Sequence, residues 1–149
     1  MSKDGFRVVL GDWSTLGPDA SPIREQVFVH EQNVPLDMEW DEMDAVCVHA
    51  VAYDSSGRPA GTGRLLPDGH IGRMAVLVPV RRLGVGALLL QSLVQAARIR
   101  GDTAVMLNAQ IHAEAFYRRF GFVREGEEFM EAGIAHIHMR CKIAAETLV

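Results

Sequence analysis

The fold of this chain is decided by Arg81-Arg82-Leu83-Gly84-Val85-Gly86, which leads directly into Ala87-Leu88-Leu89-Leu90-Gln91-Ser92-Leu93-Val94. The two glycines let the backbone turn so that several N–H groups point the same way. The positive end of the dipole of the following helix lies at the same place, and Arg81 or Arg82 adds charge-assisted contacts. The stretch therefore predicts a cradle for a pyrophosphate group.

The spacing of this stretch excludes two common phosphate-binding motifs. A P-loop needs Gly-Lys-Ser/Thr after four intervening residues, which this stretch does not contain. A dinucleotide-binding fingerprint needs a third glycine, and Leu89 stands at that position. The pattern that remains is R-x-x-G-x-G after a strand-like segment, His70 to Val78.

A second motif follows later in the chain. Leu107-Asn108-Ala109-Gln110 leads into Ala113-Glu114-Ala115-Phe116-Tyr117, and Gly121-Phe122 comes after it. The two motifs, in this order, resemble the acyl-CoA motif and the later A-x-x-F-Y and G-F signature of the GNAT superfamily of N-acyltransferases. The resemblance extends over nearly the whole chain, from about residue 6 to residue 143.

Two further segments are similar to one branch of this superfamily. Phe28 to Val34 matches F-V-x-E-Q-x-V, and Phe129 to Met139 matches F-x-E-x-G-I-x-H-x-x-M. Both patterns are typical of the ElaA-like GNAT proteins. The resemblance implies an N-acetyltransferase that uses acetyl-CoA as the acyl donor.

Length and composition suit one domain over residues 1–149. The 149 residues are 48% hydrophobic and 23% charged, which is ordinary for a globular protein with one core. The longest apolar stretch, Ala87 to Val94, is too short to span a membrane, and the first residues lack the apolar core of a signal peptide. We therefore expect a cytoplasmic protein that has no membrane partner.

The charge balance argues against nucleic acid as a partner. The net charge is −4 and the isoelectric point is about 5.8, whereas proteins that bind the phosphate backbone usually carry a basic excess. A nucleic-acid-binding module would have to rely on local positive charge, from Arg81, Arg82, Arg118, Arg119 and Arg124.

The order of the expected elements favours an α+β fold with a mixed, mostly antiparallel sheet and helices on both faces. Strands and turns alternate through the front half and make it antiparallel: strands are expected at residues 6–10, 46–53, 59–66 and 70–78, with turns at 54–57 and 67–69. A helix that is capped by Ser21 and has Pro22 in its first turn should carry three side chains inward: Ile23, Val27 and Phe28.

The back half is expected to contain a βαβ unit followed by a half-buried strand. A helical stripe that ends at Gly101 contains Val85, Leu88, Leu89, Leu93 and Ala96. A buried strand over residues 103–107 and a short helix before Gly121 come next. The strand at residues 135–143 alternates, and its apolar face contains Ile137, Met139, Cys141 and Ile143.

The resemblance assigns residues to the donor side of a site. In the GNAT superfamily, the tyrosine at the position of Tyr117 donates a proton to the leaving sulfur, and Asn108 lies where the pantetheine arm passes. The backbone of Met74, Ala75 and Val76 matches the strand that pairs with pantetheine. Residue type alone leaves a structural alternative for each of these residues. Tyr117 could be a core tyrosine, Asn108 could be a turn or cap residue, and the strand at Met74 to Val76 could simply be part of the core.

The base is less well defined by the sequence. Many relatives place a glutamate on the strand before the pyrophosphate turn, but here that strand offers Gly72 and Arg73. The candidates for acceptor binding or proton removal are therefore in the two branch-specific segments: Glu31, Glu131 and His136. A solvated surface residue is the alternative for each glutamate.

Other chemistries have little support. His136 and His138 share a strand face, but no third ligand has a fixed spacing, so we expect no metal. Cys47 and Cys141 are too few for a disulfide framework and lack the sequence of a Cys–His hydrolase, which predicts buried free thiols. The run Asp37 to Asp44, with Trp40 inside it, is either an acidic mouth that attracts a cationic amine or a solvated loop.

The function that these patterns favour is direct attack of an amine on bound acetyl-CoA in a ternary complex. The acceptor would be a small-molecule or peptide amine. The alternative is a non-catalytic protein that binds acyl-CoA as a sensor or scaffold, because the sequence defines the acceptor side weakly. The acceptor, the acyl chain length and the oligomeric state, with a homodimer among the options, stay open.

Overall fold

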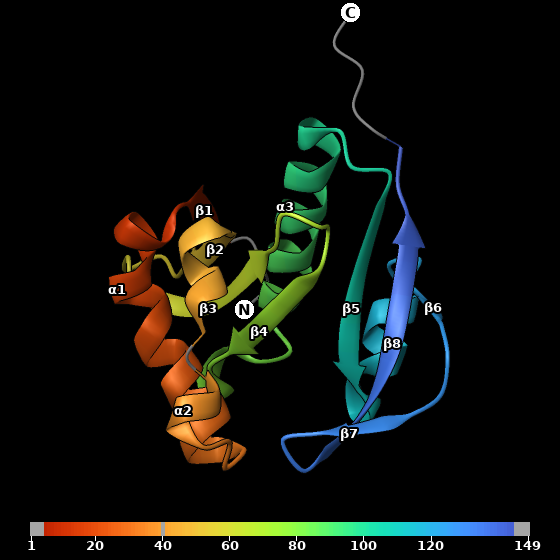
Figure 1. Ribbon diagram of the computed structural model, residues 1–149. Coiled ribbons are helices and arrows are strands. Elements are labelled where there is room, and N and C mark those ends of the chain that lie inside the picture. The colour runs from red at the N-terminus through yellow and green to blue at the C-terminus, as the bar shows by residue number, and fades with distance from the viewer. Residues whose placement is uncertain (1–4, 40, 145–149) are drawn as a thin grey trace, which may run out of the picture.

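Two antiparallel sheets make up the framework of the chain (Figure 1). The computed structural model describes residues 5–39 and 41–144. The first sheet has the order β1 (Arg7–Gly11), β2 (Val48–Tyr53), β3 (Pro59–Leu65), β4 (Ile71–Val76). The second has the order β5 (Ala104–Gln110), β8 (Ile134–Lys142), β6 (Val123–Arg124), and β7 (Phe129–Glu131) also pairs with β8. The predicted α+β class is confirmed.

The helical elements surround these sheets (Figure 1). They are α1 (Trp13–Arg24), the π-helix η2 (Glu25–Glu31), α2 (Leu36–Glu39), α3 (Val85–Arg100), α4 (Glu114–Arg118) and the short 3-10 helices η3 (Glu42–Val46), η4 (Val78–Val80) and η5 (Ile111–Ala113). The short helix expected before Gly121 is present as α4.

Two of these helices cover opposite faces of the first sheet. Successive residues of a strand point to opposite faces. On β2, Val51 belongs to a buried cluster with Leu16 of α1, whereas its neighbour Ala50 belongs to a cluster with Leu89 of α3. The prediction of helices on both faces is therefore confirmed.

The first helix begins earlier than the sequence predicted. It starts at Trp13, and Asp12 caps it by accepting a hydrogen bond from the backbone N–H of Thr15 at 3.0 Å. The expected N-terminal cap at Ser21 is wrong, because Ser21 and Pro22 lie inside the helix. The helix continues through the proline, which has no N–H to donate, because its inner face is buried against the first sheet.

The third helix ends as expected, but its buried stripe is shifted around the helix. Gly101 closes it with a φ of 99°, a left-handed conformation that glycine adopts without strain. Leu90 and Ala97 are fully buried, whereas Leu88 and Ala96, which the sequence placed on the stripe, are half-buried. The stripe is shifted because α3 shares one core cluster with strands of both sheets.

The last strand buries one face as predicted. Ile137 and Met139 are fully buried and Ile143 is nearly so, whereas Cys141 is half-buried. Cys47 is buried at the start of β2, and both cysteines are free thiols. Neither thiol therefore links the two halves of the chain covalently.

The two sheets touch at β4 and β5 and then separate (Figure 1). His70 pairs with Met106 in a parallel bridge, and the backbone N–H of Met106 donates to the carbonyl of Gly69 at 3.1 Å. Beyond this bridge, the edge of β4 that faces β5 has no strand partner in the described part of the chain. The expected βαβ unit is present, but its parallel strands diverge and leave a space between the sheets.

A β-bulge in β4 lies next to this space. Thr62 pairs with Ala75 and Arg64 with Gly72, so two residues of β4, Arg73 and the one after it, lie opposite one residue of β3. Arg73 has a φ of 51°, which is left-handed. Across residues 5–39 and 41–144, no helix is both long enough and apolar enough to span a membrane.

Candidate active site

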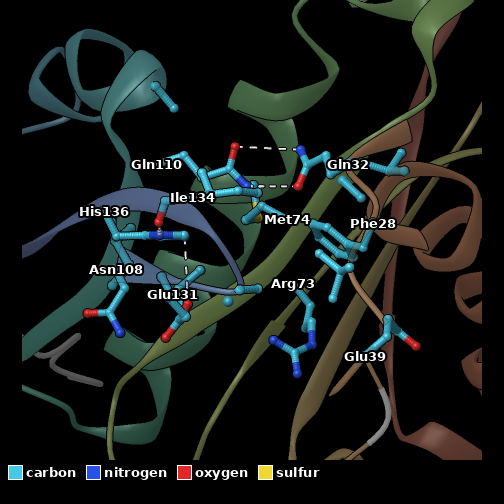
Figure 2. Close-up of a pocket in the computed structure, with 18 of the residues that line it drawn as sticks. Phe28, Gln32, Glu39, Arg73, Met74, Asn108, Gln110, Glu131, Ile134 and His136 are labelled. Atoms are coloured by element: carbon cyan, nitrogen blue, oxygen red, sulfur yellow. Dashed lines mark hydrogen bonds and ion pairs between the residues drawn. The ribbon is translucent and has the colours of Figure 1, made fainter. Parts of the chain in front are cut away.

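A cavity of about 1000 Å³ lies where β4 and β5 diverge (Figure 2). Its walls come from η2 and β4 on one side and from β5, α4, β7 and β8 on the other. The residues singled out from the sequence that line it are Glu31, Met74, Ala75, Val76, Arg81, Asn108, Tyr117, Glu131 and His136. The structure thus brings the acceptor-side candidates into the same cavity as Tyr117.

His136 and Glu131 lie close together on the wall formed by β7 and β8 (Figure 2). His136 Nδ1 is 2.7 Å from the carbonyl oxygen of Ile134, and Nε2 is 3.6 Å from Oε2 of Glu131. A carbonyl oxygen can only accept, so Nδ1 carries the proton and Nε2 of the neutral ring holds the lone pair. His136 is buried and Glu131 is half exposed, so a buried imidazole lies beside a solvent-accessible carboxylate.

Tyr117 lines the same cavity from α4. Its ring packs edge-on against Phe116 and Phe122, with ring centroids 5.1 and 5.9 Å apart. Burial raises the pKa of Tyr117 to about 12, so the phenol keeps its proton at neutral pH. Within residues 5–39 and 41–144 its hydroxyl makes no hydrogen bond, and it is therefore free to donate one to a ligand.

Glu31 is held by Arg81, which directly precedes the glycine turn. Arg81 donates two hydrogen bonds to its carboxylate, at 2.6 and 2.7 Å, and a third from Nε to the carbonyl of Val76 at 2.9 Å. The hydrogen bonds from Arg81 lower the pKa of Glu31, which makes this carboxylate a weaker base. This geometry favours a clamp between η2 and the turn after β4, and it leaves His136 and Glu131 as the better-placed acceptor-side candidates.

The glycine turn itself, residues 82–86, lies beside the cavity at the start of α3. Gly84 has a φ of 86°, and no side chain of the described residues caps the first turn of α3. A Cβ added at Gly86 would meet Phe116 Cζ at 3.6 Å, an ordinary contact, so packing within the protein does not require glycine there. Arg82 is exposed and has no hydrogen-bond or ion-pair partner in the described part of the chain. Open N–H groups and a free arginine fit the predicted pyrophosphate.

Amide side chains line the β5 side of the cavity. Asn108 accepts a hydrogen bond from His138 Nδ1 at 2.8 Å. Gln110 donates to the amide oxygen of Gln32 at 2.9 Å, which joins the end of β5 to the end of η2 (Figure 2). The sequence does not reveal this glutamine pair, because no local pattern indicates that the two segments meet.

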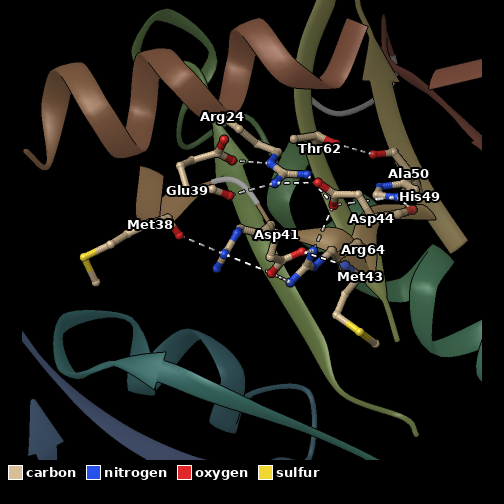
Figure 3. Close-up of polar contacts among 11 residues, drawn as sticks. Arg24, Met38, Glu39, Asp41, Met43, Asp44, His49, Ala50, Thr62 and Arg64 are labelled. Atoms are coloured by element: carbon tan, nitrogen blue, oxygen red, sulfur yellow. Dashed lines mark hydrogen bonds and ion pairs between the residues drawn. The ribbon is translucent and has the colours of Figure 1, made fainter. Parts of the chain in front are cut away.

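The acidic run before β2 turns inward and forms a buried ion-pair cluster (Figure 3). Glu39 and Asp44 are each 3% exposed, and Arg24 contacts them at 2.5 and 2.8 Å. Arg64 also contacts Asp44 at 2.8 Å. The predicted acidic mouth is therefore wrong, because arginines from α1 and β3 neutralise these carboxylates. A solvated loop describes only the exposed acids of the run, Asp37 and Glu42.

Asp41 completes this cluster. Arg64 donates to its two carboxylate oxygens at 2.6 and 2.7 Å, and the guanidinium lowers the pKa of Asp41 to about 2. Trp40, the aromatic residue within the acidic run, lies outside the described residues. We call Arg24, Glu39, Asp41, Asp44 and Arg64 the ion-pair cluster.

Arg73 reaches the cavity from the bulge in β4 (Figure 2). Its Nη2 is 3.3 Å from Asp41 Oδ2 and 3.4 Å from the carbonyl of Met38, and its Nε is buried without a partner. Burial and the positive charge of Arg64 lower the pKa of Arg73. The sequence signal for this residue was its place on the strand where many relatives carry glutamate.

The arginines that a nucleic-acid-binding module would use are largely engaged elsewhere. Arg118 and Arg124 pair with Glu114 at 2.9 and 2.7 Å, and the Arg119 guanidinium lies 5.8 Å from the centre of the Phe116 ring. Ion pairing reduces the positive charge that this surface could offer to phosphates. The structure therefore gives no support to the nucleic-acid interpretation.

The two histidines that share a face of β8 have separate partners. His136 lies beside Glu131, whereas His138 lies beside Asn108 and 3.6 Å from Glu125. No group of three or more His, Cys, Asp or Glu side chains is arranged to hold a metal ion within residues 5–39 and 41–144.

Comparison with known proteins identifies the family. The chain matches the model of the acetyltransferase (GNAT) domain over residues 16–143 and belongs to this family. It is 42% identical over 125 residues to an uncharacterized N-acetyltransferase of Bacillus subtilis, YjcF, and the alignment covers 81% of this chain and 89% of YjcF. The GNAT identification made from the two motifs is confirmed.

Solved structures agree with this assignment. An acyl-CoA N-acyltransferase from Pseudomonas aeruginosa is 33% identical, with a TM-score of 0.81, over 91% of this chain and 99% of the other. ElaA of Escherichia coli is 27% identical, also with a TM-score of 0.81, over the same shares of the two chains, 91% and 99%. The expected similarity to ElaA is therefore confirmed.

Proposed function

We propose that this chain transfers an acetyl group from acetyl-CoA to an amine by direct attack in a ternary complex. Membership of the GNAT family implies acyl transfer from an acyl-CoA. The observation that carries the finer proposal is that His136, Glu131 and Tyr117 line one cavity beside the unpaired edge of β4.

The donor would lie along β4 and the glycine turn. The open N–H groups at Gly84 to Gly86 and the side chain of Arg82 would hold the pyrophosphate. The unpaired backbone edge at Met74 to Val76 would pair with the pantetheine arm, and Asn108 lies on the opposite wall. This placement would bring the thioester into the cavity between Tyr117 and His136.

The acceptor must lose a proton before it can attack. A lysine-like amine has a pKa of about 10.4, so holding it neutral at pH 7 costs about 4.6 kcal/mol. His136 would accept this proton at Nε2, while its Nδ1–H stays bonded to the carbonyl of Ile134. Glu131 would stabilise the resulting imidazolium from 3.6 Å.

The bond exchange and the proton transfer to sulfur would take place in the same cavity. The amine nitrogen forms a bond to the thioester carbonyl carbon, and the carbon–sulfur bond breaks. Tyr117, which burial keeps protonated, would donate its proton to the leaving sulfur. The second proton that the nitrogen loses as the amide forms would restore the Tyr117 phenol through solvent, and His136 would release the first proton to solvent. The products are an N-acetylated amine and the free thiol of CoA.

A screen of acceptors tests this proposal. Purified protein is incubated with acetyl-CoA and pooled amines, thiol release is followed, and acetylated products are identified by mass spectrometry. We expect amine-dependent thiol release that is strongly reduced in His136→Gln. Tight acetyl-CoA binding without amine-dependent release in any pool would contradict the proposal and favour the acyl-CoA sensor.

A further inference from the structure

Arg73 differs from the two arginines of the ion-pair cluster in its contacts to carboxylates, although the Nε of Arg64, like that of Arg73, is buried without a partner. Every ion-pair contact of 3.1 Å or less to Glu39, Asp41 and Asp44 comes from Arg24 or Arg64. Arg73 has a longer contact of 3.3 Å to Asp41 Oδ2, which already accepts a hydrogen bond of 2.7 Å from Arg64, and one of 3.4 Å to the carbonyl of Met38. The carboxylates nearest to Arg73 thus already accept short hydrogen bonds from Arg24 or Arg64.

The backbone directs this incompletely paired side chain into the cavity. Arg73 sits in the bulge of β4 with a φ of 51°, a conformation that most side chains avoid. The side chain is 28% exposed and lines the cavity (Figure 2), while its Nη2 lies toward Asp41 and Met38. Nη1 has no hydrogen-bond partner within residues 5–39 and 41–144, and Nε is buried and unpartnered. Strained backbone that presents unfilled donors to a cavity indicates a ligand group at that place.

The opposite wall of the cavity carries charge of the other sign. Glu131 and the lone pair of His136 lie on β7 and β8, across from Arg73 on β4 (Figure 2). The cavity therefore has a proton-accepting side and a cationic side. A molecule with an ammonium group and an anionic group would match both at once.

We propose that the acceptor is an amine that also carries a carboxylate, and that Arg73 binds this carboxylate while the amine lies at His136. The inference rests on the proposed function and names the class of its acceptor. A planar guanidinium matches a carboxylate better than any other side chain does. Binding would complete the donors of Arg73 and would orient the amine toward the thioester.

The test compares matched acceptors. Thiol release from acetyl-CoA is measured with ω-amino carboxylic acids and with alkylamines of the same chain length. We expect the KM of the best acid to be about tenfold to a hundredfold lower than that of its matched alkylamine. Arg73→Gln should remove most of this ratio, and Arg73→Lys should keep part of it, because lysine preserves the charge without the planar geometry.

Arg58→Gln is the matched control, because Arg58 lies on the β2–β3 hairpin with its side chain 79% exposed. It should leave the ratio of KM values unchanged. Equal KM values for acids and alkylamines in the native protein would overturn the inference while the transfer function stands. So would a ratio that survives Arg73→Gln in a protein whose thermal unfolding is normal.

A binding measurement separates this inference from the proposed function. Calorimetry with CoA-saturated protein and the same amino acids reports the carboxylate site without any transfer. Binding that is lost in Arg73→Gln would support the site even if no thiol is released, in which case the proposed transfer fails alone. No binding of any amino acid and no selective turnover would overturn the inference.

Discussion

The ion-pair cluster and the facing wall of the cavity use polar side chains in opposite ways. In the cluster, Arg24 and Arg64 have side chains 2% and 7% exposed, and carboxylates occupy their short contacts. On the wall formed by α4, β7 and β8, the Tyr117 hydroxyl has no hydrogen bond to another described residue. His136 keeps Nε2 free of any contact closer than 3.6 Å to a carboxylate.

The difference shows which groups stabilise the protein and which are available for chemistry. A buried charge is tolerated only when hydrogen bonds and opposite charges replace its water. A group that must bind substrate or exchange a proton needs an unfilled donor or acceptor instead. The two regions therefore differ in how many hydrogen-bond and ion-pair partners their polar side chains have. They do not differ in residue type, since both contain acids and bases.

The largest effect on activity is expected at the wall formed by α4, β7 and β8. His136→Gln should lower kcat by about a hundredfold to ten-thousandfold, because the base is lost while a side chain of similar size remains. The activity that remains should keep rising toward alkaline pH, since only the free amine then reacts. Steady-state kinetics over a pH series measure this, with Glu131→Gln expected to show a smaller loss. Unchanged kcat in His136→Gln would mean that another group removes the proton.

Removing an arginine from the ion-pair cluster should affect the stability of the fold rather than catalysis. Arg24→Met leaves Glu39 and Asp44 buried without this partner and should lower the free energy of unfolding by about 3–5 kcal/mol. Urea denaturation followed by circular dichroism measures the change, and acetyl-CoA affinity is measured below the unfolding transition. Weakened acetyl-CoA binding with normal stability would show that the cluster serves the site instead.

Tyr117→Phe should lower kcat by about tenfold to a thousandfold with little change in the KM for acetyl-CoA. The hydroxyl would act on charge that develops at sulfur in the transition state. Kinetics with acetyl-CoA as the varied substrate measure this. A variant that melts earlier but keeps full activity would identify Tyr117 as a core residue.

Asp41→Asn should show how far the stability that the ion-pair cluster provides depends on pH. The pKa of Asp41 is lowered from 3.8 to about 2 in the folded state, so the ionised form stabilises the fold above pH 4 by at most about 2 kcal/mol. This stability is lost as the pH falls from about 4 to 2. The native protein should therefore be more stable than the variant at pH 7, and urea titrations should show the gap closing below pH 4. A gap that is independent of pH would exclude ionisation as its cause.

The smallest effect is expected at Arg82, which has no partner among the described residues, and Arg58, which is paired with Asp54, serves as the comparison. Arg82→Gln should raise the Kd for CoA by about fivefold, and less at high salt, because an exposed charge contributes about 1 kcal/mol and is screened. Calorimetry at two salt concentrations measures this, with Arg58→Gln as the control that should change nothing. A salt-independent loss would indicate that Arg82 shapes the turn instead of meeting charge.

Much of the framework could be predicted because local rules govern it. Gly101 ends α3, the hairpin turns separate β2, β3 and β4, and alternation in β8 buries Ile137 and Met139, all as expected. Local reasoning failed at Ser21, where a cap and a following proline are typical of a helix start. Packing against the first sheet continued the helix through both, which no window of neighbouring residues reveals.

The sequence by itself determined the family, the glycine turn with the helix after it, and the short list that contains Tyr117, Glu131 and His136. Only the tertiary structure decided that Glu31 is clamped by Arg81, that the acidic run is neutralised, and that Arg73 faces the cavity with donors to spare. The physical reason is distance along the chain. Turns, caps and periodicity act between near neighbours, whereas these ion pairs join residues from 15 to 50 positions apart, which only folding brings within reach.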